Sequence, residues 1–238
     1  PWTLECSGLL AQPTTLKLDA LTARARKMGP HLFECSGNAN PSNFGLMSVA
    51  EWDGIPLTEV VQRLKPTKEA TGVLVSGYDH IGQVSQRSIV GASWVFPLET
   101  LAKLNPHLAI RMNGAPLPHY NGFPARLVIP GWTATYWVKH LTSIRAVSKP
   151  FDGFWMKGAY RIPNGMFPAQ QRFLSQETDV NTPITEMVVN SLIVTPNEGQ
   201  RFTAGQAVNV TGIAWDGGFG IRSVQVSTDG GTTWNDAI

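Results

Sequence analysis

Short apolar stretches rich in Val, Ile, Trp and Phe recur along the chain, as in TGVLVSGYD, RLVIPGW and SLIVTP, and glycines and prolines separate them. Runs of this length and composition are typical of strands. Helical patterns are fewer. We predict helices at residues 15–28, 57–65 and 97–105, with Thr58 as the N-cap of the second. The pattern therefore predicts an α+β fold that is mostly β.

The pattern loosens after about residue 165 into a polar stretch marked by prolines, and we predict a linker over residues 166–182. Short apolar stretches separated by turns follow over residues 183–238. Among them, Asp229-Gly230-Gly231 lies between SVQVS and TTW, which predicts a hairpin. Evenly spaced short strands favour a β-sandwich of immunoglobulin type. We therefore predict a first domain over residues 1–165 and a second over residues 183–238.

Both ends of the chain suggest missing segments. Pro1 opens directly into a strand pattern, and Ile238 follows the hairpin without a closing strand. We therefore expect the first domain to lack its N-terminal part and the second domain to be incomplete.

The charge balance narrows the classes of partner. The 238 residues contain 19 Lys+Arg and 17 Asp+Glu, and no basic block or stripe occurs. We therefore expect neither a nucleic-acid nor a membrane partner. No apolar run approaches the roughly 20 residues that a membrane-spanning helix needs.

The tetrapeptide Glu-Cys-Ser-Gly occurs twice and contains the only cysteines, Cys6 and Cys35. Cys6 lies between a strand pattern and a turn at Gly8, which is typical of a small buried apolar side chain. Cys35 follows the apolar HLFE and precedes SGNANPSNFG, a run of turn-forming residues. A thiolate at the end of a strand can be presented to a metal or to a substrate. A Cys6–Cys35 disulfide or a papain-like nucleophile remains open on these observations alone.

Five stretches together resemble the molybdopterin-dependent sulfite oxidase family. In chain order they are FECSGN, EWDGIPL, MNGAPLPHYNGFPARLVIPGWTATYWVKHLTSI, WMKGAYRIP and GIAWDGGFGIRSVQVSTDGGTTW. The resemblance spans essentially the whole chain and is closest to the catalytic subunits of bacterial sulfite dehydrogenases. It implies molybdenum and molybdopterin as cofactors, a cofactor domain followed by an immunoglobulin-like dimerisation domain, and a homodimer.

The resemblance also implies roles for individual residues. Cys35 would bind molybdenum as a thiolate beside the dithiolene sulfurs of one molybdopterin. Tyr160 matches the catalytic tyrosine of the family, and Trp52 matches a tryptophan that lines the substrate pocket. The implied cofactor-binding residues are Cys35, Ser36, Asp79, Asn121, Arg126, Trp137, Val138 and Lys139.

The chain departs from the family pattern at two positions. Many members have a histidine where Asn121 stands, although asparagine also donates hydrogen bonds. Sulfite-oxidising members commonly carry an arginine in the substrate pocket five residues after the cysteine, where this chain has Asn40. The loss of that guanidinium should weaken sulfite binding by about 1.5 to 3 kcal/mol. Two further family arginines would lie upstream of Pro1 and beyond Ile238.

The activity that the resemblance implies is oxidation of sulfite to sulfate by oxygen-atom transfer. The chain has no haem-binding C-x-x-C-H motif, so we expect the electrons to pass to a c-type cytochrome. We also expect a periplasmic location, with a twin-arginine signal upstream.

Two other functions remain open. One is a sulfoxide reductase of the same superfamily, which Asn40 favours and the second domain disfavours. The other is a non-catalytic, β-rich dimerisation or binding scaffold, which would leave Cys35, Tyr160 and the cofactor-binding stretches without a role.

Overall fold

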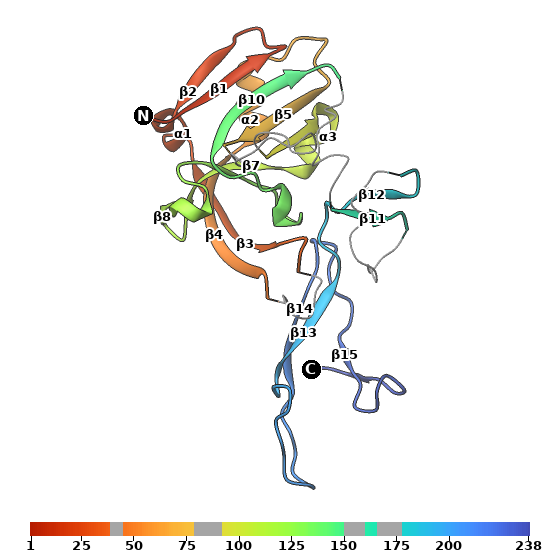
Figure 1. The fold of residues 1–238 in the computed structure, drawn as a ribbon. Coiled ribbons are helices and arrows are strands. Elements are labelled where there is room, and N and C mark those ends of the chain that lie inside the picture. Colours follow the sequence, from red (N-terminus) through yellow and green to blue (C-terminus); the bar gives the residue numbers. More distant parts are fainter. Residues whose placement is uncertain (39–44, 79–91, 150–159, 166–177) are drawn as a thin grey trace, which may run out of the picture. The chain divides into compact units, whose positions relative to one another are not determined.

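The computed structural model describes residues 1–38, 45–78, 92–149, 160–165 and 178–238, and its secondary structure is mostly β (Figure 1). The chain divides into two compact units, Pro1–Glu186 and Met187–Ile238. The prediction of an α+β fold that is mostly β is confirmed.

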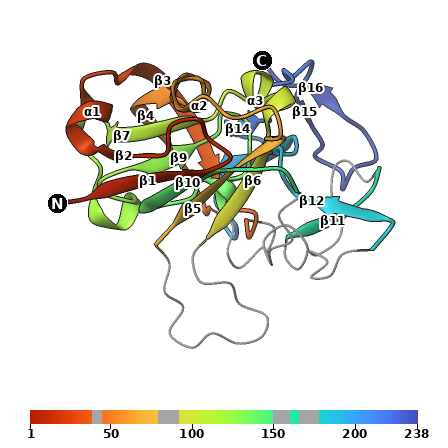
Figure 2. The ribbon, with the colours of Figure 1, turned by 90° about the horizontal axis from the view of Figure 1, so that it is seen from above.

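In one five-stranded sheet of the first unit, the first strand of the chain pairs with a strand that comes much later in the sequence. β1 and β10 are parallel, and the other strand pairs are antiparallel. Figure 2 shows β1, β10, β5 and β6 side by side. The order in the sheet is β2 (Thr14–Lys17), β1 (Thr3–Gly8), β10 (Leu141–Val147), β5 (Gly72–Gly77) and β6 (Ser93–Pro97).

The second five-stranded sheet supplies the strand that precedes Cys35. Antiparallel pairing of β3 with β4 places Glu34 opposite Met47, so the chain segments on either side of residues 39–44 come together. The sheet consists of β3 (Arg26–Glu34), β4 (Met47–Pro56), β7 (His107–Met112) and β8 (Ala115–Pro116), with β9 (Arg126–Val128) paired to β7.

The helices are short, and one predicted helix is largely absent. Strands β2 and β3 occupy both ends of residues 15–28, which leaves only the short helix α1 (Leu18–Thr22) between them. Helix α2 (Leu57–Leu64) begins two residues earlier than an N-cap at Thr58 requires. Its N-cap is Pro56, without a side-chain cap, so the prediction for Thr58 was wrong. The third prediction corresponds to α3 (Leu98–Leu104).

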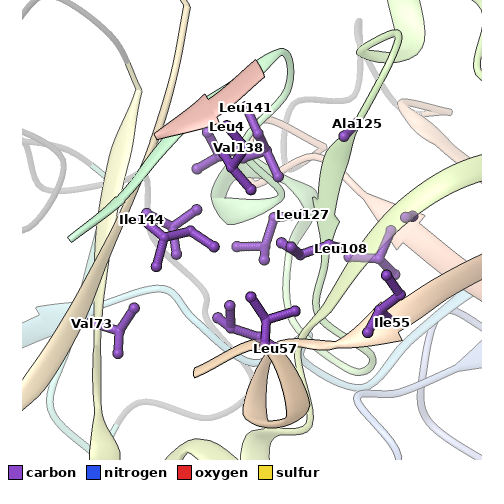
Figure 3. Close-up of a cluster of buried hydrophobic side chains, with 14 of the residues drawn as sticks. Leu4, Ile55, Leu57, Val73, Leu108, Ala125, Leu127, Val138, Leu141 and Ile144 are labelled. Atoms are coloured by element: carbon purple, nitrogen blue, oxygen red, sulfur yellow. The ribbon is translucent and has the colours of Figure 1, made fainter. Parts of the chain in front are cut away.

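A continuous apolar core contains residues from both sheets and from α2. Figure 3 shows the side chains of Leu127, Leu108, Leu57 and Ile144 gathered in one cluster. All four are nearly inaccessible to solvent, and each contributes about 1.5 to 3 kcal/mol through burial. The core fixes both sheets, and the polar groups of the site lie on their strands or on the segments that connect them.

A small antiparallel pair, β11 (Arg161–Pro163) and β12 (Asn181–Pro183), completes the first unit. Two residues of the predicted linker, Asn181 and Thr182, belong to β12 and pair within this unit. The division between the units accordingly falls after Glu186, later than the predicted end of the linker at residue 182. Residues 166–177 of that prediction lie outside the described residues.

The second unit contains two antiparallel strand pairs among its described residues: β13 (Asn190–Thr195) with β14 (Thr211–Trp215), and β15 (Gln225–Val226) with β16 (Asn235–Asp236). The predicted hairpin at Asp229 is confirmed. The Asp229 carboxylate accepts from the backbone N–H groups of Thr232 and Thr233 at 3.0 and 2.9 Å. Hydrogen bonds from Thr233 and Ser227 hold the pKa of Asp229 at about 2.

In the part of the chain that the structure describes, no helix combines the length and apolar character needed to cross a bilayer.

Two histidines of the second sheet make the stability of the first unit sensitive to acid. Burial lowers the pKa of His107, and the nearby charges of His31 and Arg26 lower it further. Burial also lowers the pKa of His31. Both side chains are therefore favoured in the neutral form in the folded state, and the unfolded state binds protons more readily.

We expect the free energy of unfolding to be highest above the unfolded-state histidine pKa of about 6.5 and to decrease as the pH falls through it. Urea unfolding between about pH 8 and pH 5 measures this slope. A His107→Gln variant should show a shallower slope, whereas the exposed His119→Gln variant should retain the wild-type slope. Equal slopes in all three proteins would contradict the assignment.

Candidate active site

Cys35 lies directly after β3, at the start of a turn. Its backbone N–H donates to the Leu46 carbonyl at 3.0 Å, and its carbonyl accepts from the Asn38 N–H at 2.9 Å. The thiol is half-buried and free. The predicted position of Cys35 at the end of a strand is therefore confirmed.

Cys6 has a different environment. It is 1% exposed within the core, and burial raises the pKa of its thiol to about 11. Both cysteines are free, which excludes the disulfide between them in this structure. The interpretation of Cys6 as a small buried apolar side chain is confirmed.

The sulfur of Cys35 receives a hydrogen bond from the protein. The backbone N–H of Gly37 donates to Sγ at 3.3 Å. A donor in this position stabilises negative charge on the sulfur and orients it, as hydrogen bonds around ligating sulfurs do. The turn after β3 thus presents the sulfur in a form suited to bind a soft metal ion.

The buried side chain of Asn38 joins the two chain segments that flank residues 39–44. Its Oδ1 accepts from the N–H groups of Gly45 at 2.8 Å and Leu46 at 3.0 Å. Its Nδ2 donates to Oε1 of Glu34 at 2.7 Å. Asn38 and Glu34 are both almost fully buried, so we name this pair the Asn38–Glu34 clamp. The clamp fixes the chain on both sides of Cys35.

A group of three hydroxyls supports the same turn from the other side. Ser36 donates through its N–H to Thr135 Oγ1 at 3.2 Å and through its Oγ to Thr133 Oγ1 at 3.0 Å. Thr135 Oγ1 donates to Ser36 Oγ at 2.8 Å. Ser36, a predicted cofactor-binding residue, thus directs its hydroxyl toward Thr133 and Thr135.

Cys35 and Tyr160 line the same pocket although 124 intervening residues separate them in the chain. The pocket has a volume of about 220 Å³. Val138, a predicted cofactor-binding residue, also lines this pocket. The full lining is Cys35, Ala92, Ser93, Trp94, Thr135, Tyr136, Val138 and Tyr160.

Tyr160 has a left-handed backbone conformation, with φ at +50°. Such a conformation is unfavourable for a residue other than glycine and persists only where the surroundings impose it. Its carbonyl accepts from the Ile184 N–H at 2.7 Å and from the Tyr136 hydroxyl at 3.4 Å. Burial raises the pKa of the Tyr160 phenol, and the charge of Cys35 raises it further. The phenol is therefore a hydrogen-bond donor at neutral pH.

A buried cation lies beside two tryptophan rings that also contact each other. The guanidinium carbon of Arg126 is 5.2 Å from the ring centroid of Trp52 and 5.7 Å from that of Trp137. Its Nη1 and Nη2 donate to the carbonyls of Asn121 and Trp137, each at 3.1 Å. Burial lowers the pKa of Arg126 to about 10. Among the described residues, no carboxylate lies within ion-pair distance of this guanidinium.

Trp52 does not occupy its predicted place in the substrate pocket. It is 1% exposed and packs edge-on against Phe33 and Trp137, with ring centroids 5.7 and 5.9 Å apart. The described pocket lining does not include it. Its position on β4, facing the core, explains the difference. The indole N–H groups of Trp52 and Trp137 have no acceptor within the described part of the chain.

A glycine brings the remaining predicted anchors together. Gly122 has φ at +104°, and a Cβ there would lie 3.0 Å from Cβ of Lys139 and 3.1 Å from Cβ of Arg126. Only glycine allows this close approach. Asn121 lies beside it at the end of the 3₁₀ helix η2 (His119–Asn121), and Lys139 Nζ donates to the Tyr120 carbonyl at 3.1 Å. Two other predicted site residues, Asn40 and Asp79, lie outside the described residues.

The donor set fits a molybdopterin-bound metal better than a metal held by the protein alone. No group of three or more His, Cys, Asp or Glu residues that could hold a metal exists among the described residues. One thiolate at Cys35 would therefore share the metal with ligands of the cofactor. The indole N–H groups of Trp52 and Trp137 are buried donors without an acceptor among the described residues, and Arg126 donates to backbone carbonyls but has no anionic partner there. A polar, anionic cofactor could supply both.

Sequence reasoning missed several residues of this site. They are Glu34, Asn38, Ser93, Trp94, Thr133, Thr135 and Tyr136. Asn38 belongs to the quoted FECSGN stretch, so its presence in that motif was a signal. Thr133, Thr135 and Tyr136 belong to the long third stretch, but nothing in their spacing indicates hydrogen bonds to Ser36 or Tyr160.

Two family models match the chain. Residues 1–155 match the oxidoreductase molybdopterin binding domain. Residues 181–238 match the Mo-co oxidoreductase dimerisation domain. The second match begins with β12, which pairs within the first compact unit.

Curated relatives match nearly the whole chain at low identity. Mitochondrial sulfite oxidase of Rattus norvegicus is 28% identical over 243 residues, which cover 95% of this chain and 43% of the relative. Nitrate reductase [NADH] 2 of Arabidopsis thaliana is 26% identical, and the match covers 98% of this chain and 28% of the relative. The chain thus spans less than half the length of either relative.

A solved structure supports the fold. The sulfane dehydrogenase SoxCD from Paracoccus pantotrophus aligns with a TM-score of 0.79 at 23% identity, covering 100% of this chain and 59% of the matched chain. At this identity the likeness establishes the fold alone. The match of residues 1–155 to the oxidoreductase molybdopterin binding domain, together with the sulfite oxidase relatives, confirms the expected cofactor class, and the chain belongs to the sulfite oxidase family of molybdopterin-dependent oxidoreductases.

Proposed function

We propose that the chain is the catalytic part of a molybdenum-dependent enzyme that oxidises sulfite to sulfate by oxygen-atom transfer. The observation that carries this proposal is the shared pocket of Cys35 and Tyr160 in a member of this family. Sulfite and water are consumed, and sulfate, two protons and two electrons are released. When bound, the cofactor supplies the transferred oxygen atom and accepts the electrons.

The residues of the pocket have distinct tasks in this proposal. Cys35 binds the metal through Sγ, which the Gly37 N–H orients. Tyr160 donates a hydrogen bond from its phenol to the oxyanion. The hydroxyls of Ser93 and Thr135, which donate to Ser76 and Ser36, add polar oxygen atoms to the lining, while Trp94 and Val138 exclude water.

The cofactor itself is anchored away from the substrate. Arg126 and Lys139 supply positive charge for the phosphate end of the pterin. Asn121 and Trp137 provide donors beside them. The fixed approach of Lys139 to Arg126 across Gly122 supports this assignment.

We further propose a c-type cytochrome as the electron acceptor, a periplasmic location, and a homodimer formed through the second unit. The likeness to bacterial sulfite dehydrogenases supports the first two. The match to a Mo-co oxidoreductase dimerisation domain supports the third.

Oxidation of a sulfane sulfur is a second candidate. The described residues that line the pocket carry no cationic side chain, and the residue five positions after Cys35 is Asn40 rather than arginine. Both observations favour a substrate with less negative charge than sulfite. The solved structure that aligns with the whole chain is named a sulfane dehydrogenase. Reduction of sulfoxides is favoured by the same lining and is the third activity to test.

The proposed ligand role of Cys35 predicts the metal content. Protein purified from a host that makes the cofactor should contain near-stoichiometric molybdenum by mass spectrometry, and oxidative release should yield fluorescent pterin. We expect Cys35→Ala to lose molybdenum or to alter its spectrum, and the control Cys6→Ala to keep both. Wild-type protein without molybdenum and pterin would contradict the proposed function.

The proposed substrate predicts an effect at Asn40. With ferricyanide as acceptor, an Asn40→Arg variant should lower the KM for sulfite by about tenfold or more, because a charged hydrogen bond is worth about 1.5 to 3 kcal/mol. Rates with a sulfane donor, and with a sulfoxide plus reduced viologen, provide the comparison. An unchanged KM for sulfite, with faster turnover of a sulfane, would favour the second candidate.

The Asn38–Glu34 clamp predicts retention of the cofactor. Asn38→Ala removes a donor to the buried Glu34 carboxylate and the side-chain acceptor of two backbone N–H groups. We expect the free energy of unfolding to fall by about 1 to 3 kcal/mol and molybdenum to be lost faster on dilution. The matched control Asn164→Ala removes an exposed asparagine that donates to a backbone carbonyl, and it should change neither quantity by more than about 0.5 kcal/mol or its equivalent in rate. If Asn38→Ala retains molybdenum as well as the wild-type protein does, the clamp has no role in cofactor retention.

A further inference from the structure

Thr133 occupies the centre of a set of hydrogen bonds between three separate parts of the first unit. It is 5% exposed. Its Oγ1 donates to the Ile184 carbonyl at 3.1 Å and accepts from Ser36 Oγ at 3.0 Å. Its N–H donates to the Thr185 carbonyl at 2.7 Å. One side chain therefore contacts both the turn of Cys35 and the segment that follows β12.

The segment after β12 leads directly to Tyr160. The Ile184 N–H donates to the Tyr160 carbonyl at 2.7 Å, and β12 pairs with β11, which begins at the residue after Tyr160. The backbone of Ile184 thus connects Thr133 to Tyr160, because its carbonyl accepts from the threonine hydroxyl and its N–H donates to the tyrosine carbonyl.

The last acceptor of these hydroxyl hydrogen bonds, the Ile184 carbonyl, determines which group donates and which accepts in each of them. The Ile184 carbonyl can only accept, so the Thr133 hydroxyl must donate to it. Thr133 can then only accept from Ser36, and Ser36 in turn accepts from Thr135. The Ser36 N–H fills the acceptor position on Thr135. Every hydroxyl in this series has one orientation, and we name the series the Thr133 chain.

Tyr160 needs such a support because its own elements are small. β11 and β12 form a two-stranded pair, and isolated pairs of this size are marginally stable. The backbone of Tyr160 also has an unfavourable φ of +50°, which its surroundings must stabilise. Cys35, by contrast, follows a strand of a five-stranded sheet.

We propose that Thr133 is a positioning residue that fixes Tyr160 relative to the Cys35 sulfur, through Ser36 on one side and Ile184 on the other. The proposal rests on the proposed function of the Cys35–Tyr160 pocket. The geometric consequence is a constant separation between the metal ligand and the phenol that contacts the substrate. A displacement of about 1 Å in such a site lowers turnover by about 100-fold.

The experiment compares Thr133→Val, which has the same shape without a hydroxyl, with Thr133→Ser, which keeps the hydroxyl. Thr142→Val is the matched control, because Thr142 is a half-buried threonine that donates to a backbone carbonyl, that of Ser76, elsewhere in the unit. Each variant is made as the cofactor-loaded chain. The measurements are molybdenum content, kcat and KM for sulfite, the Mo(V) electron paramagnetic resonance spectrum, and amide hydrogen exchange of Ser36 and Ile184.

We expect Thr133→Val to keep its molybdenum, to lose at least about tenfold in kcat with a smaller change in KM, and to shift the Mo(V) spectrum. Hydrogen exchange should become faster at both Ser36 and Ile184. Thr133→Ser and Thr142→Val should both keep the wild-type kcat, KM, Mo(V) spectrum and exchange rates. A role in stability alone would lower the unfolding temperature without shifting the spectrum or separating kcat from KM.

A Ser36→Ala variant gives an independent test. If the Thr133 chain joins the two halves of the site, Ser36→Ala should speed hydrogen exchange at Ile184, which Ser36 does not contact directly. Exchange at Ile184 that is unaffected by both Ser36→Ala and Thr133→Val would overturn the proposal and leave sulfite oxidation standing. Coupled exchange in a molybdenum-containing protein that does not oxidise sulfite would instead contradict the proposed substrate and support the positioning role.

Discussion

The clamp formed by the buried side chains of Asn38 and Glu34 is the constraint on which the rest of the site depends. A thiol at the end of a strand has no defined direction unless the turn that carries it is fixed. Asn38 fixes this turn by accepting from two backbone N–H groups beyond residues 39–44 and donating to a carboxylate before Cys35. The Gly37 N–H can then reach the sulfur. The shape of the pocket, the hydroxyl contacts of Ser36 and the placement of Tyr160 relative to the sulfur all depend on the position of this turn.

Burial of a cation among aromatic rings distinguishes the second half of the site. Transfer of an unpaired guanidinium out of water is costly, and hydrogen bonds to carbonyls together with the faces of Trp52 and Trp137 offset only part of that cost. Such a group is favourable when an anion also binds nearby. The apo chain therefore carries a local cost that binding of a phosphorylated cofactor would relieve. This couples cofactor binding to the stability of β9 and of the segment around Trp137.

Short-range sequence patterns correctly predicted the elements that depend mainly on interactions between residues close together in the chain. The strand before Cys35, the helix over residues 57–65 and the hairpin at Asp229 follow from periodicity and turn residues. The helix predicted over residues 15–28 failed because pairing of β2 and β3 with their neighbours outweighed a helical pattern that spans only one short stretch. The motifs of the family pointed to Cys35 and Tyr160, which line one pocket, but no motif says that the Trp52 ring faces the core. That orientation is decided by the register of β4 against β3.

The contacts of Thr133 were beyond prediction for a related reason. They join residues near positions 36, 133, 160 and 184, and each bond involves a turn or a segment between strands, where no periodic pattern constrains partners. The sequence shows which residues carry hydroxyls, but only the fold shows that these hydroxyls are hydrogen-bonded to one another.

The fixed orientation of these hydroxyls limits what they can transfer. A proton relay needs groups that can accept a proton at one end, release it at the other and then turn back. This series ends on a backbone carbonyl, which cannot pass a proton onward, and each of its hydroxyls has a single direction. It can therefore transmit position but not acidity, and a proton released in the pocket cannot leave along this series.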